Sequence, residues 1–394
     1  MTKEPATSLE PVVVVDSTLN ALGVVRSLAW GGMPIFMVTR SRFCPGAWTR
    51  HCRVVRFPNS RGRDFIDRLK VLGRDIGRRP VLILTGDVEV EAVSTYREEL
   101  QPLFRFSLPS KEMVSTLADK AKFQVWAEQE GFPVPRAVVF TATSDMKLLE
   151  NLALPVVIKP SDKGDAGQGE RPVKAETVEQ ARSVSAHMLA RAKALIVQEW
   201  IAGDDIDIYF TLFSCDSQGE LICIFSGRKL VCHPPEVGMT AICVSARDVG
   251  IELEQITRDF IKRTKYSGLG SLEFKRHRQT GQFIIVEPTI GRTDWQEEIA
   301  TLCGTNIPLT TYWSEVRREI QPTPGKPEPL AWRSSIVHRL PRGMAPPKTQ
   351  VWDGYFRLTD PLPGVYYYVI DVFSRKLAKR LLPAAAIDFA RKRL

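Results

Sequence analysis

The sequence predicts a protein of mixed α/β and α+β class, with a parallel sheet near the N-terminus and antiparallel strands in the second half. The first observation is the run VVVVD at 12–16, which a helical pattern follows directly. The second is a group of antiparallel strands predicted between 208 and 245. The third is a hairpin, EFKRHRQTGQFIIVEP at 273–288, whose arms join at a turn that contains Gly281. This order of elements is typical of a chain with two different folded units.

The first hundred residues repeat one strand–helix unit. Apolar runs at 35–38, 54–57 and 81–84 follow the first strand, with helical patterns between them. Such runs are typical of parallel strands that are buried on both faces. The turn after the first strand reads STLNALG and lacks the G-x-G-x-x-G that places a pyrophosphate on a helix N-terminus. A dinucleotide-dependent dehydrogenase is therefore disfavoured.

The middle of the chain combines helix, strand and glycine-rich loop. We expect one helix over 110–131, which contains Lys120, and a strand at 155–160, which contains Lys159. The loop SDKGDAGQGE that follows at 161–170 has three glycines, and glycine lets backbone N–H groups approach an anion closely. A loop of this kind predicts a phosphate-binding segment, although a plain connector is the alternative.

The hairpin carries a glutamate on each arm, where the alternation calls for apolar residues. Glu273 and Glu287 could both reach one face of the hairpin. Two unpaired carboxylates side by side are costly unless they have a cation, a shared proton or basic partners. The alternative is a surface hairpin whose glutamates pair with Lys275, Arg276 or Arg278.

Bulk composition fits an ordinary globular protein of two or three domains. The chain has 394 residues, 44% of them apolar, and its seven cysteines and five histidines show no zinc-ligand spacing, so we expect reduced thiols. The N-terminus has no apolar run of signal-peptide type, which gives a cytoplasmic location as the default expectation. No pattern of an RNA-binding module occurs, and we expect no nucleic-acid partner.

The C-terminal part is harder to interpret. PTPGKPEP at 322–329 predicts a linker, and YYYVIDVF at 366–373 predicts a strand. The last stretch, SRKLAKRLLPAAAIDFARKRL, has seven basic residues and one acidic residue. A solvated helix face is the ordinary interpretation of such a tail, and weak contact with a membrane surface is the alternative.

Taken in order, these features resemble the ATP-grasp superfamily, and within it the carboxylate–amine ligase branch. The likeness covers about residues 11–315 and rests on the series of a helical lysine, a strand lysine, the glycine-rich loop, QEWIAGDD, GRKL and the two-glutamate hairpin. It implies a Rossmann-like pre-ATP-grasp domain at 1–108. It further implies an ATP-grasp domain at 109–320, with a lid lobe at about 135–200. A linker with a basic extension would follow at 321–394.

The resemblance also implies roles for individual residues. The ATP-binding set would be Lys120, Lys159, Lys163, Gly164, Gly167, Gly169, Gln198, Glu199, Trp200, Ile201 and Asp205. The lysines would hold phosphates, the segment from 198 to 201 would bind adenine, and Asp205 would meet the ribose. Lys122 is a close rival of Lys120, and Asp204 and Asp207 leave the ribose ligand open.

Catalytic and metal-binding roles follow in the same way. Arg228 and Lys229 would face the γ-phosphate and the acyl-phosphate oxygens. Arg292 would either bind the substrate carboxylate or stabilise the tetrahedral intermediate. Glu273, Glu287 and Thr289 would hold Mg²⁺, with Mn²⁺ as a substitute. Thr289 stands where the family usually has asparagine, so the second metal position is in question.

The resemblance implies an ATP-dependent ligase that joins a carboxylate to an amine through an acyl phosphate and releases ADP and phosphate. The carboxylate would be a small molecule or a polymer precursor, the amine would be of the amino-acid kind, and a homodimer is compatible with the family. The alternatives are an inactive ATP-binding scaffold, which Thr289 would favour, and a biotin-independent carboxylase.

Overall fold

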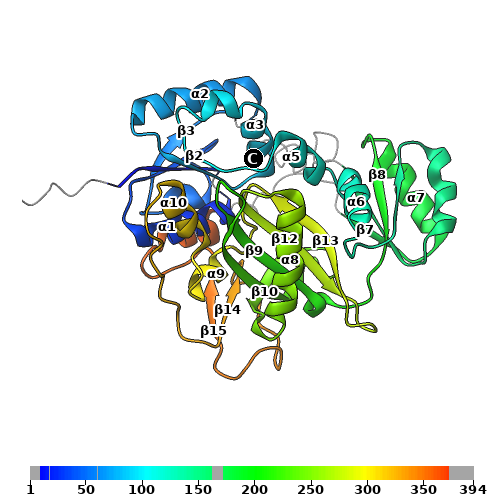
Figure 1. Ribbon diagram of the computed structural model, residues 1–394. Helices are drawn as coiled ribbons and strands as arrows, with labels where there is room; N and C mark the ends of the chain where they lie inside the picture. The colour runs from blue at the N-terminus through cyan, green and yellow to red at the C-terminus, as the bar shows by residue number, and fades with distance from the viewer. Residues whose placement is uncertain (1–8, 17, 60, 162–171, 372–394) are drawn as a thin grey trace, which may run out of the picture.

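The computed structural model describes residues 9–16, 18–59, 61–161 and 172–371. Figure 1 shows a parallel sheet on the left, a small lobe on the right, and a large sheet between them. The described strands form three sheets. Their strand orders are β3-β2-β1-β4, β5-β8-β6-β7 and β13-β12-β9-β10-β11-β14-β15. The mixed α/β and α+β class that the sequence predicts is confirmed.

The N-terminal sheet is parallel throughout. Its strands are β1 (Val12–Val15), β2 (Ile35–Thr39), β3 (Arg53–Arg56) and β4 (Val81–Leu84). Its helices are α1 (Leu19–Leu28), α2 (Gly62–Ile76), α3 (Asp87–Thr95) and α4 (Arg97–Leu100), with short 3₁₀ turns η1 (Ala29–Gly31) and η2 (Pro45–Trp48). Alternate valines of β1 face two different cores, so helices cover both faces of the sheet.

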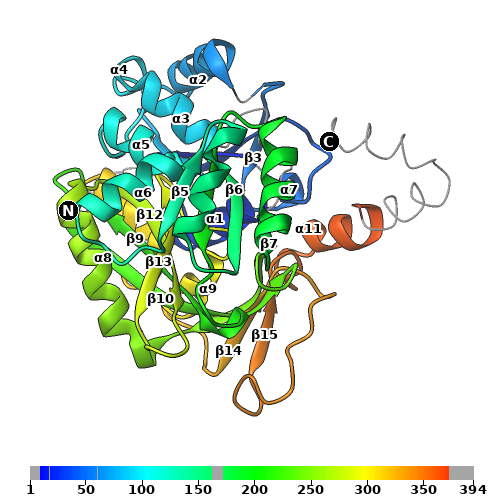
Figure 2. The same cartoon turned by 90° about the vertical axis from the view of Figure 1, so that its right-hand side faces the viewer.

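The small lobe is an antiparallel sheet with one long helix. Its strands are β5 (Ala137–Phe140), β6 (Val156–Pro160), β7 (Val173–Ala175) and β8 (Leu195–Glu199). Helix α7 (Val178–Leu189) and the 3₁₀ segment η3 (Thr143–Asn151) cover it and form a separate apolar core. Figure 2 shows the lobe in front of the large sheet.

The large sheet is antiparallel except for its last pair. Its strands are β9 (Ile208–Cys215), β10 (Leu221–His233), β11 (Met239–Ser245), β12 (Gly268–Arg276), β13 (Phe283–Ile290), β14 (Leu330–Arg333) and β15 (Gln350–Asp353). Helix α8 (Gly250–Thr264) packs on one face, and α9 (Glu298–Leu302) and α10 (Ile307–Glu315) pack on the other. The segment predicted as linker and extension thus contributes two strands to this sheet.

Two elements differ from the sequence predictions. The helix predicted over 110–131 is two helices, α5 (Lys111–Ala118) and α6 (Lys120–Gln129), because the Asp119 carboxylate caps α6 by accepting from two backbone N–H groups. The strand predicted at 366–373 is wrong for its described part. Residues 366–371 form the π-helix η6 (Tyr366–Asp371), which continues from α11 (Leu362–Val365), and its Tyr366 and Tyr367 rings stack on Trp48 and Tyr355.

Within the part of the chain that the structure describes, no helix combines the length and the apolar character needed to cross a bilayer.

Candidate active site

The two glutamates of the hairpin lie directly opposite each other on β12 and β13. Glu273 is the cross-strand partner of Glu287, and their side chains are 27% and 33% exposed. Gly281 forms the turn with a φ of 74°, which glycine adopts without strain. Thr289 lies two residues beyond Glu287, so it shares that face of the strand. The structure thus brings three oxygen-bearing side chains together on one face of the hairpin.

Each of these carboxylates has a lysine beside it. Lys229, which is almost fully buried on β10, forms an ion pair with Glu273. Burial alone would lower the pKa of Lys229, but the adjacent Glu273 carboxylate outweighs it and raises that pKa. Lys120, the first residue of α6, places its Nζ 3.1 Å from Oε1 of Glu287. Lysines from two different elements, β10 and α6, therefore balance the negative charge of the two glutamates.

A third lysine enters from the small lobe. Lys159 on β6 is 8% exposed, and its Nζ donates to Oε1 of Gln198 at 3.0 Å. Burial, assisted by the positive charge of Lys120, lowers the pKa of Lys159. Gln198 in turn donates to Gln124 at 3.0 Å, and Gln124 donates to the carbonyl of Pro135 at 2.6 Å. Gln124 was missed from the sequence, because a glutamine in a helix gives no sign of being buried.

A cavity of about 120 Å³ opens between the small lobe and the hairpin. Seven of the residues singled out from the sequence line it: Lys159, Gln198, Glu199, Trp200, Ile201, Glu273 and Glu287. Lys120 lines a small adjoining cavity together with Lys159, Gln198 and Glu287. Residues separated by up to 167 positions along the chain therefore meet at one place, where lysines and carboxylates surround an apolar slot.

Lys275 and Glu236 also line this cavity and were not assigned to it from the sequence. Nζ of Lys275 lies 3.8 Å from the ring centroid of Trp200, which is a cation–π contact. Burial lowers the pKa of Lys275 to about 8. A signal for Lys275 existed, since it lies two residues beyond Glu273 and so shares its face of β12.

Arg228, Asp205 and Glu199, three residues predicted for the site, have side chains that contact backbone groups elsewhere. Arg228 is the neighbour of Lys229 on β10, so its side chain points to the opposite face, where Nε donates to the carbonyl of Ile206 at 2.6 Å. The structure therefore does not bring Arg228 to the hairpin carboxylates, and of the two adjacent cations only Lys229 lies beside Glu273. The Asp205 carboxylate accepts from the backbone N–H groups of Cys232 and Glu236, each at 2.8 Å.

Glu199 lines the cavity, but its carboxylate accepts from the backbone N–H of Ala153 at 2.8 Å. Four further predicted residues, Lys163, Gly164, Gly167 and Gly169, lie outside the described residues.

Arg292 connects the end of β13 to the N-terminal domain. Its Nε donates to Oδ1 of Asp87 at 2.6 Å, and Nη1 lies 3.9 Å from Asp294. Burial opposes the charge of Arg292, but the Asp87 carboxylate outweighs this effect and raises the pKa of the guanidinium. Asp87 is the first residue of α3, close to the carboxyl end of β4, where open α/β sheets bind ligands.

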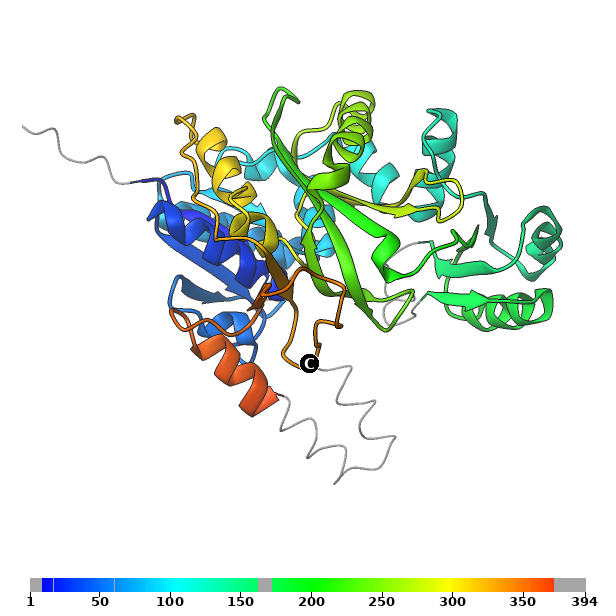
Figure 3. The ribbon, with the colours of Figure 1, turned by 90° about the horizontal axis from the view of Figure 1, so that it is seen from below.

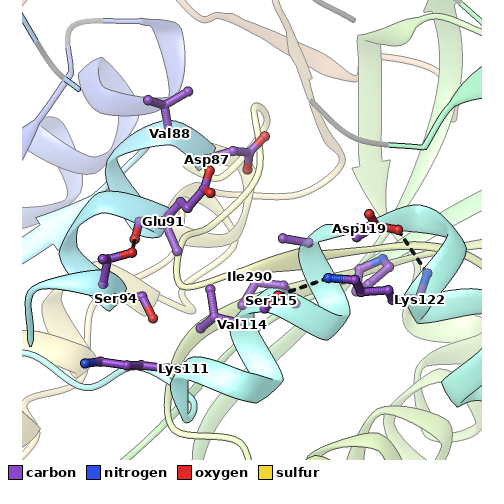
Figure 4. A pocket seen from close by; sticks show the side chains of 14 residues that line it. Asp87, Val88, Glu91, Ser94, Lys111, Val114, Ser115, Asp119, Lys122 and Ile290 are labelled. Carbon is purple, nitrogen blue, oxygen red and sulfur yellow. Dashed lines mark hydrogen bonds between the residues drawn. The ribbon is translucent and has the colours of Figure 1, made fainter. Parts of the chain in front are cut away.

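A second and larger cavity, of about 510 Å³, lies on the far side of Asp87. Figure 4 shows Asp87 and Glu91 of α3 facing Val114 and Ser115 of α5 across it, with Lys122 of α6 at one end. Lys122 donates to Oγ of Ser115 at 3.3 Å. This cavity shares Ala118 and Pro288 with the lining of the small cavity that Lys120 enters, so the two spaces adjoin.

The donor set at the hairpin fits a hard divalent cation. Among the described residues, no three His, Cys, Asp or Glu side chains form a ready-made metal cage. Mg²⁺ in nucleotide enzymes is commonly held by one or two carboxylates and by substrate phosphates. Glu273 and Glu287 supply two such carboxylates beside three lysines, and Thr289 adds a hydroxyl.

Comparisons with known proteins show what the whole chain is similar to. No family model matches the chain. The D-aspartate ligase of Enterococcus faecium is 21% identical over 322 residues, a match that covers 75% of this chain and 74% of that protein. Among solved structures, the biotin carboxylase domain of Hydrogenobacter thermophilus 2-oxoglutarate carboxylase, in complex with MgADP, ADP and bicarbonate, is similar with a TM-score of 0.63. It is 12% identical, and the match covers 81% of this chain and 72% of that one.

The L-amino acid ligase of Bacillus licheniformis is similar with a TM-score of 0.60 and 13% identity, over 80% of this chain and 78% of that one. Likeness at this level of identity shows the fold. The chain therefore has the fold of these solved structures, and over about three quarters of its length it is similar in sequence to a ligase.

Proposed function

We propose that this protein is an ATP-dependent ligase that joins a carboxylate to an amine and releases ADP and phosphate. The observation that carries the proposal is the cavity between the small lobe and the hairpin. In it, buried lysines and two facing glutamates surround a slot with an apolar rim. Phosphates, hard cations and a flat apolar base are the ligands that such a combination suits.

The slot would take the nucleotide. Its apolar walls, which include Val157 and Ile201, suit adenine, and the backbone after β8 would complete that contact. Lys159 and Lys120 lie on the side of Glu287 and would hold phosphate oxygens as point charges. Glu273, Glu287 and Thr289 would hold Mg²⁺, which neutralises charge on the transferring phosphoryl group when it is bound.

The larger cavity would take the acid and the amine. Arg292 is 14% exposed and forms an ion pair with Asp87, which lines this cavity. Its guanidinium would bind a substrate carboxylate, as guanidinium groups do in a bidentate manner. Asp87 and Glu91 would attract an ammonium group at the same wall of the cavity. An amino acid or an amine of similar charge is the substrate class that fits.

The reaction would have two steps. A substrate carboxylate oxygen attacks the γ-phosphorus of ATP, and the bond from that phosphorus to the β,γ-bridging oxygen breaks, so an acyl phosphate and ADP form. The amine nitrogen then attacks the acyl carbon, phosphate leaves with the C–O electron pair, and the nitrogen releases its proton. The chain's own residues position the reactants and stabilise charge, so no side-chain nucleophile is required.

The test is product analysis with purified protein, Mg²⁺, ATP and a matrix of amino acids and small carboxylic acids. We expect ADP and phosphate only where an acid and an amine are both present. AMP and pyrophosphate would show adenylate chemistry and contradict the mechanism. ATP binding without any turnover, even with a lipid-linked or polymeric acid added, would favour an inactive nucleotide-binding protein.

A further inference from the structure

A cluster of exposed apolar side chains lies far from the proposed site, where the C-terminal helix meets the N-terminal domain. We define this apolar patch by six residues: Phe43, Trp48, Leu358, Leu362, Val365 and Val369. Leu358 is 89% exposed and Phe43 is 76% exposed. Side chains of this size are normally exposed singly, and a group of them indicates a contact surface.

The segments that carry the patch are joined to one another. The Trp48 ring stacks on Tyr366 of η6 with 5.4 Å between ring centroids, and Nη1 of Arg50 donates to the carbonyl of Thr359 at 3.3 Å. Beneath them, the buried Arg26 side chain donates to Asp360 at 3.0 Å. Figure 3 shows α11 and η6 lying beside the N-terminal sheet. The patch is therefore one surface on a firmly anchored element.

Positive charge surrounds this patch. The segment from 40 to 56 contains five arginines and no acidic residue, and all five arginines are exposed: Arg40, Arg42, Arg50, Arg53 and Arg56. Residues 372–394, which continue the chain directly from the patch, contain seven basic residues and one acidic residue. These two segments thus carry a formal charge of +11, whereas the whole chain carries +9. The basic character of the sequence is therefore concentrated in these two segments.

Two acidic side chains that the structure describes in the same region are buried and engaged internally. Asp360 and Asp353 are both buried, at 2% and 7% exposure. Asp360 accepts from Arg26, and Asp353 accepts from Arg333 at 3.1 Å. Each is thus committed to an internal arginine.

We propose that this surface docks the protein on an anionic lipid bilayer. Exposed Leu, Val, Phe and Trp side chains would enter the boundary between headgroups and acyl chains, and the arginines would lie at the level of the phosphates. Trp and Arg have the amphipathic side chains that suit this boundary. The docked state is peripheral, since the patch lies on the outside of a folded domain.

Two other occupants fit the surface less well. A second copy of the chain would bring two strongly basic surfaces together across a two-fold axis, and like charges oppose that contact. A nucleic acid would match the arginines and the two aromatic rings, but it would leave Leu358, Leu362 and Val365 without an apolar partner. An anionic bilayer satisfies both the charge and the aliphatic side chains.

Co-sedimentation of the full-length protein with vesicles tests the proposal without depending on enzymatic activity. We expect binding to vesicles of phosphatidylglycerol and phosphatidylcholine, little binding to pure phosphatidylcholine, and weaker binding as salt is raised. The double variant Phe43→Ser/Leu358→Ser should bind at least about 10-fold more weakly, because two large apolar side chains no longer leave water. Ile251→Ser is the matched control, since Ile251 on α8 is 89% exposed and lies outside the patch.

A second variant, Arg42→Ser/Arg50→Ser, should lose binding to anionic vesicles in a salt-dependent way. The proposal is overturned if the wild-type protein binds no vesicles, or if the Phe43→Ser/Leu358→Ser variant binds as tightly as Ile251→Ser. It is also overturned if the same patch variants instead abolish binding of a mixed-sequence oligonucleotide or a concentration-dependent dimer in sedimentation velocity, while vesicle binding is unchanged.

Discussion

Glu273 and Glu287 face each other across two neighbouring strands, and each forms an ion pair with a lysine from a different part of the chain. Lys229 comes from the next strand but one in the large sheet, and Lys120 comes from the helix that leads into the small lobe. Two carboxylates this close repel each other unless cations share the site. The pairing therefore holds the hairpin, the sheet and the lobe in one arrangement.

Replacement of Glu287 by glutamine should abolish most of the ligase activity and leave the fold intact. The amide keeps the size of the side chain but is a poorer ligand for Mg²⁺, so we expect a loss on the order of 100-fold in kcat/KM. Activity measured against Mg²⁺ concentration checks this, with Glu252→Gln on the exposed side of α8 as control. Full activity in Glu287→Gln would contradict the metal assignment.

Lys159→Met should weaken ATP binding by about 10-fold or more without destabilising the protein. Methionine fills a similar space, and it removes a buried charge whose pKa is already lowered by burial. The melting temperature measured against ATP concentration gives both the stability of the protein and its affinity for ATP. Lys193→Met changes an exposed lysine of the same lobe and should bind ATP as the wild type does. Equal affinity in the two variants would exclude Lys159 as a phosphate ligand.

Arg292→Lys should weaken binding of the acid substrate without changing the binding of ATP. Lysine keeps the charge but cannot reproduce the planar guanidinium that contacts Asp87 at 2.6 Å. We expect KM for the acid to rise by about 10-fold or more, with the Kd for ATP unchanged. The control is Arg263→Lys, at an exposed ion pair with Glu130. A change in ATP affinity without a change in KM for the acid would instead assign Arg292 to the nucleotide site.

The stability of the protein should fall as pH rises from about 5 to 8 because of one buried carboxyl group. Glu297 on the N-terminal side of α9 is fully buried, and burial together with the neighbouring Glu298 raises its pKa from 4.5 to about 8. Between these values the folded state binds more protons than the unfolded state, so the free energy of unfolding decreases with pH.

Glu297→Gln should remove this dependence, because the amide oxygen can still accept from Ser27 and Thr301. At pH 7 to 8 we expect the variant to be more stable than the wild type by up to roughly 2 kcal/mol. Urea unfolding at several pH values measures the difference. If the free energy of unfolding changes with pH in the same way for both proteins, Glu297 does not titrate in this range.

Arg26→Ala should destabilise the protein far more than the loss of an exposed arginine. Arg26 is buried and donates to the Asp360 carboxylate and to three backbone carbonyls. Its loss removes the cation beside a buried carboxylate and is expected to cost about 3 kcal/mol. Arg63→Ala breaks the exposed pair with Glu99 and should have a much smaller effect. Chemical unfolding of both variants provides the comparison, and similar losses would refute the argument.

Local patterns explain which parts of the fold were predictable. The strands β1, β2 and β4 begin where the apolar runs begin, because a buried parallel strand must be apolar on both faces. The hairpin was predictable because alternation and a glycine turn set its register. The resemblance, and not a local pattern, pointed to Lys120, Lys159 and Gln198.

Side-chain direction explains why only one of two adjacent cations reaches the hairpin. Arg228 and Lys229 are adjacent in the sequence, but adjacent residues of a strand point to opposite faces, so only Lys229 reaches Glu273. The break at Asp119 was equally hidden, because no glycine or proline marks it. Its carboxylate accepts from Ser161 of the small lobe at 2.9 Å, a contact that depends on tertiary structure.

By itself, the sequence determined the order of most strands and helices, the two glutamates that share one face, and a resemblance to the ATP-grasp superfamily. These features depend on periodicity and on motifs, which act over a few residues. Only the tertiary structure decided that Lys275 lies over Trp200, that Arg292 binds Asp87, and that residues 330–353 complete the large sheet. Each of these contacts joins segments far apart in the chain, and their pairing follows from how the three sheets pack together rather than from any local pattern.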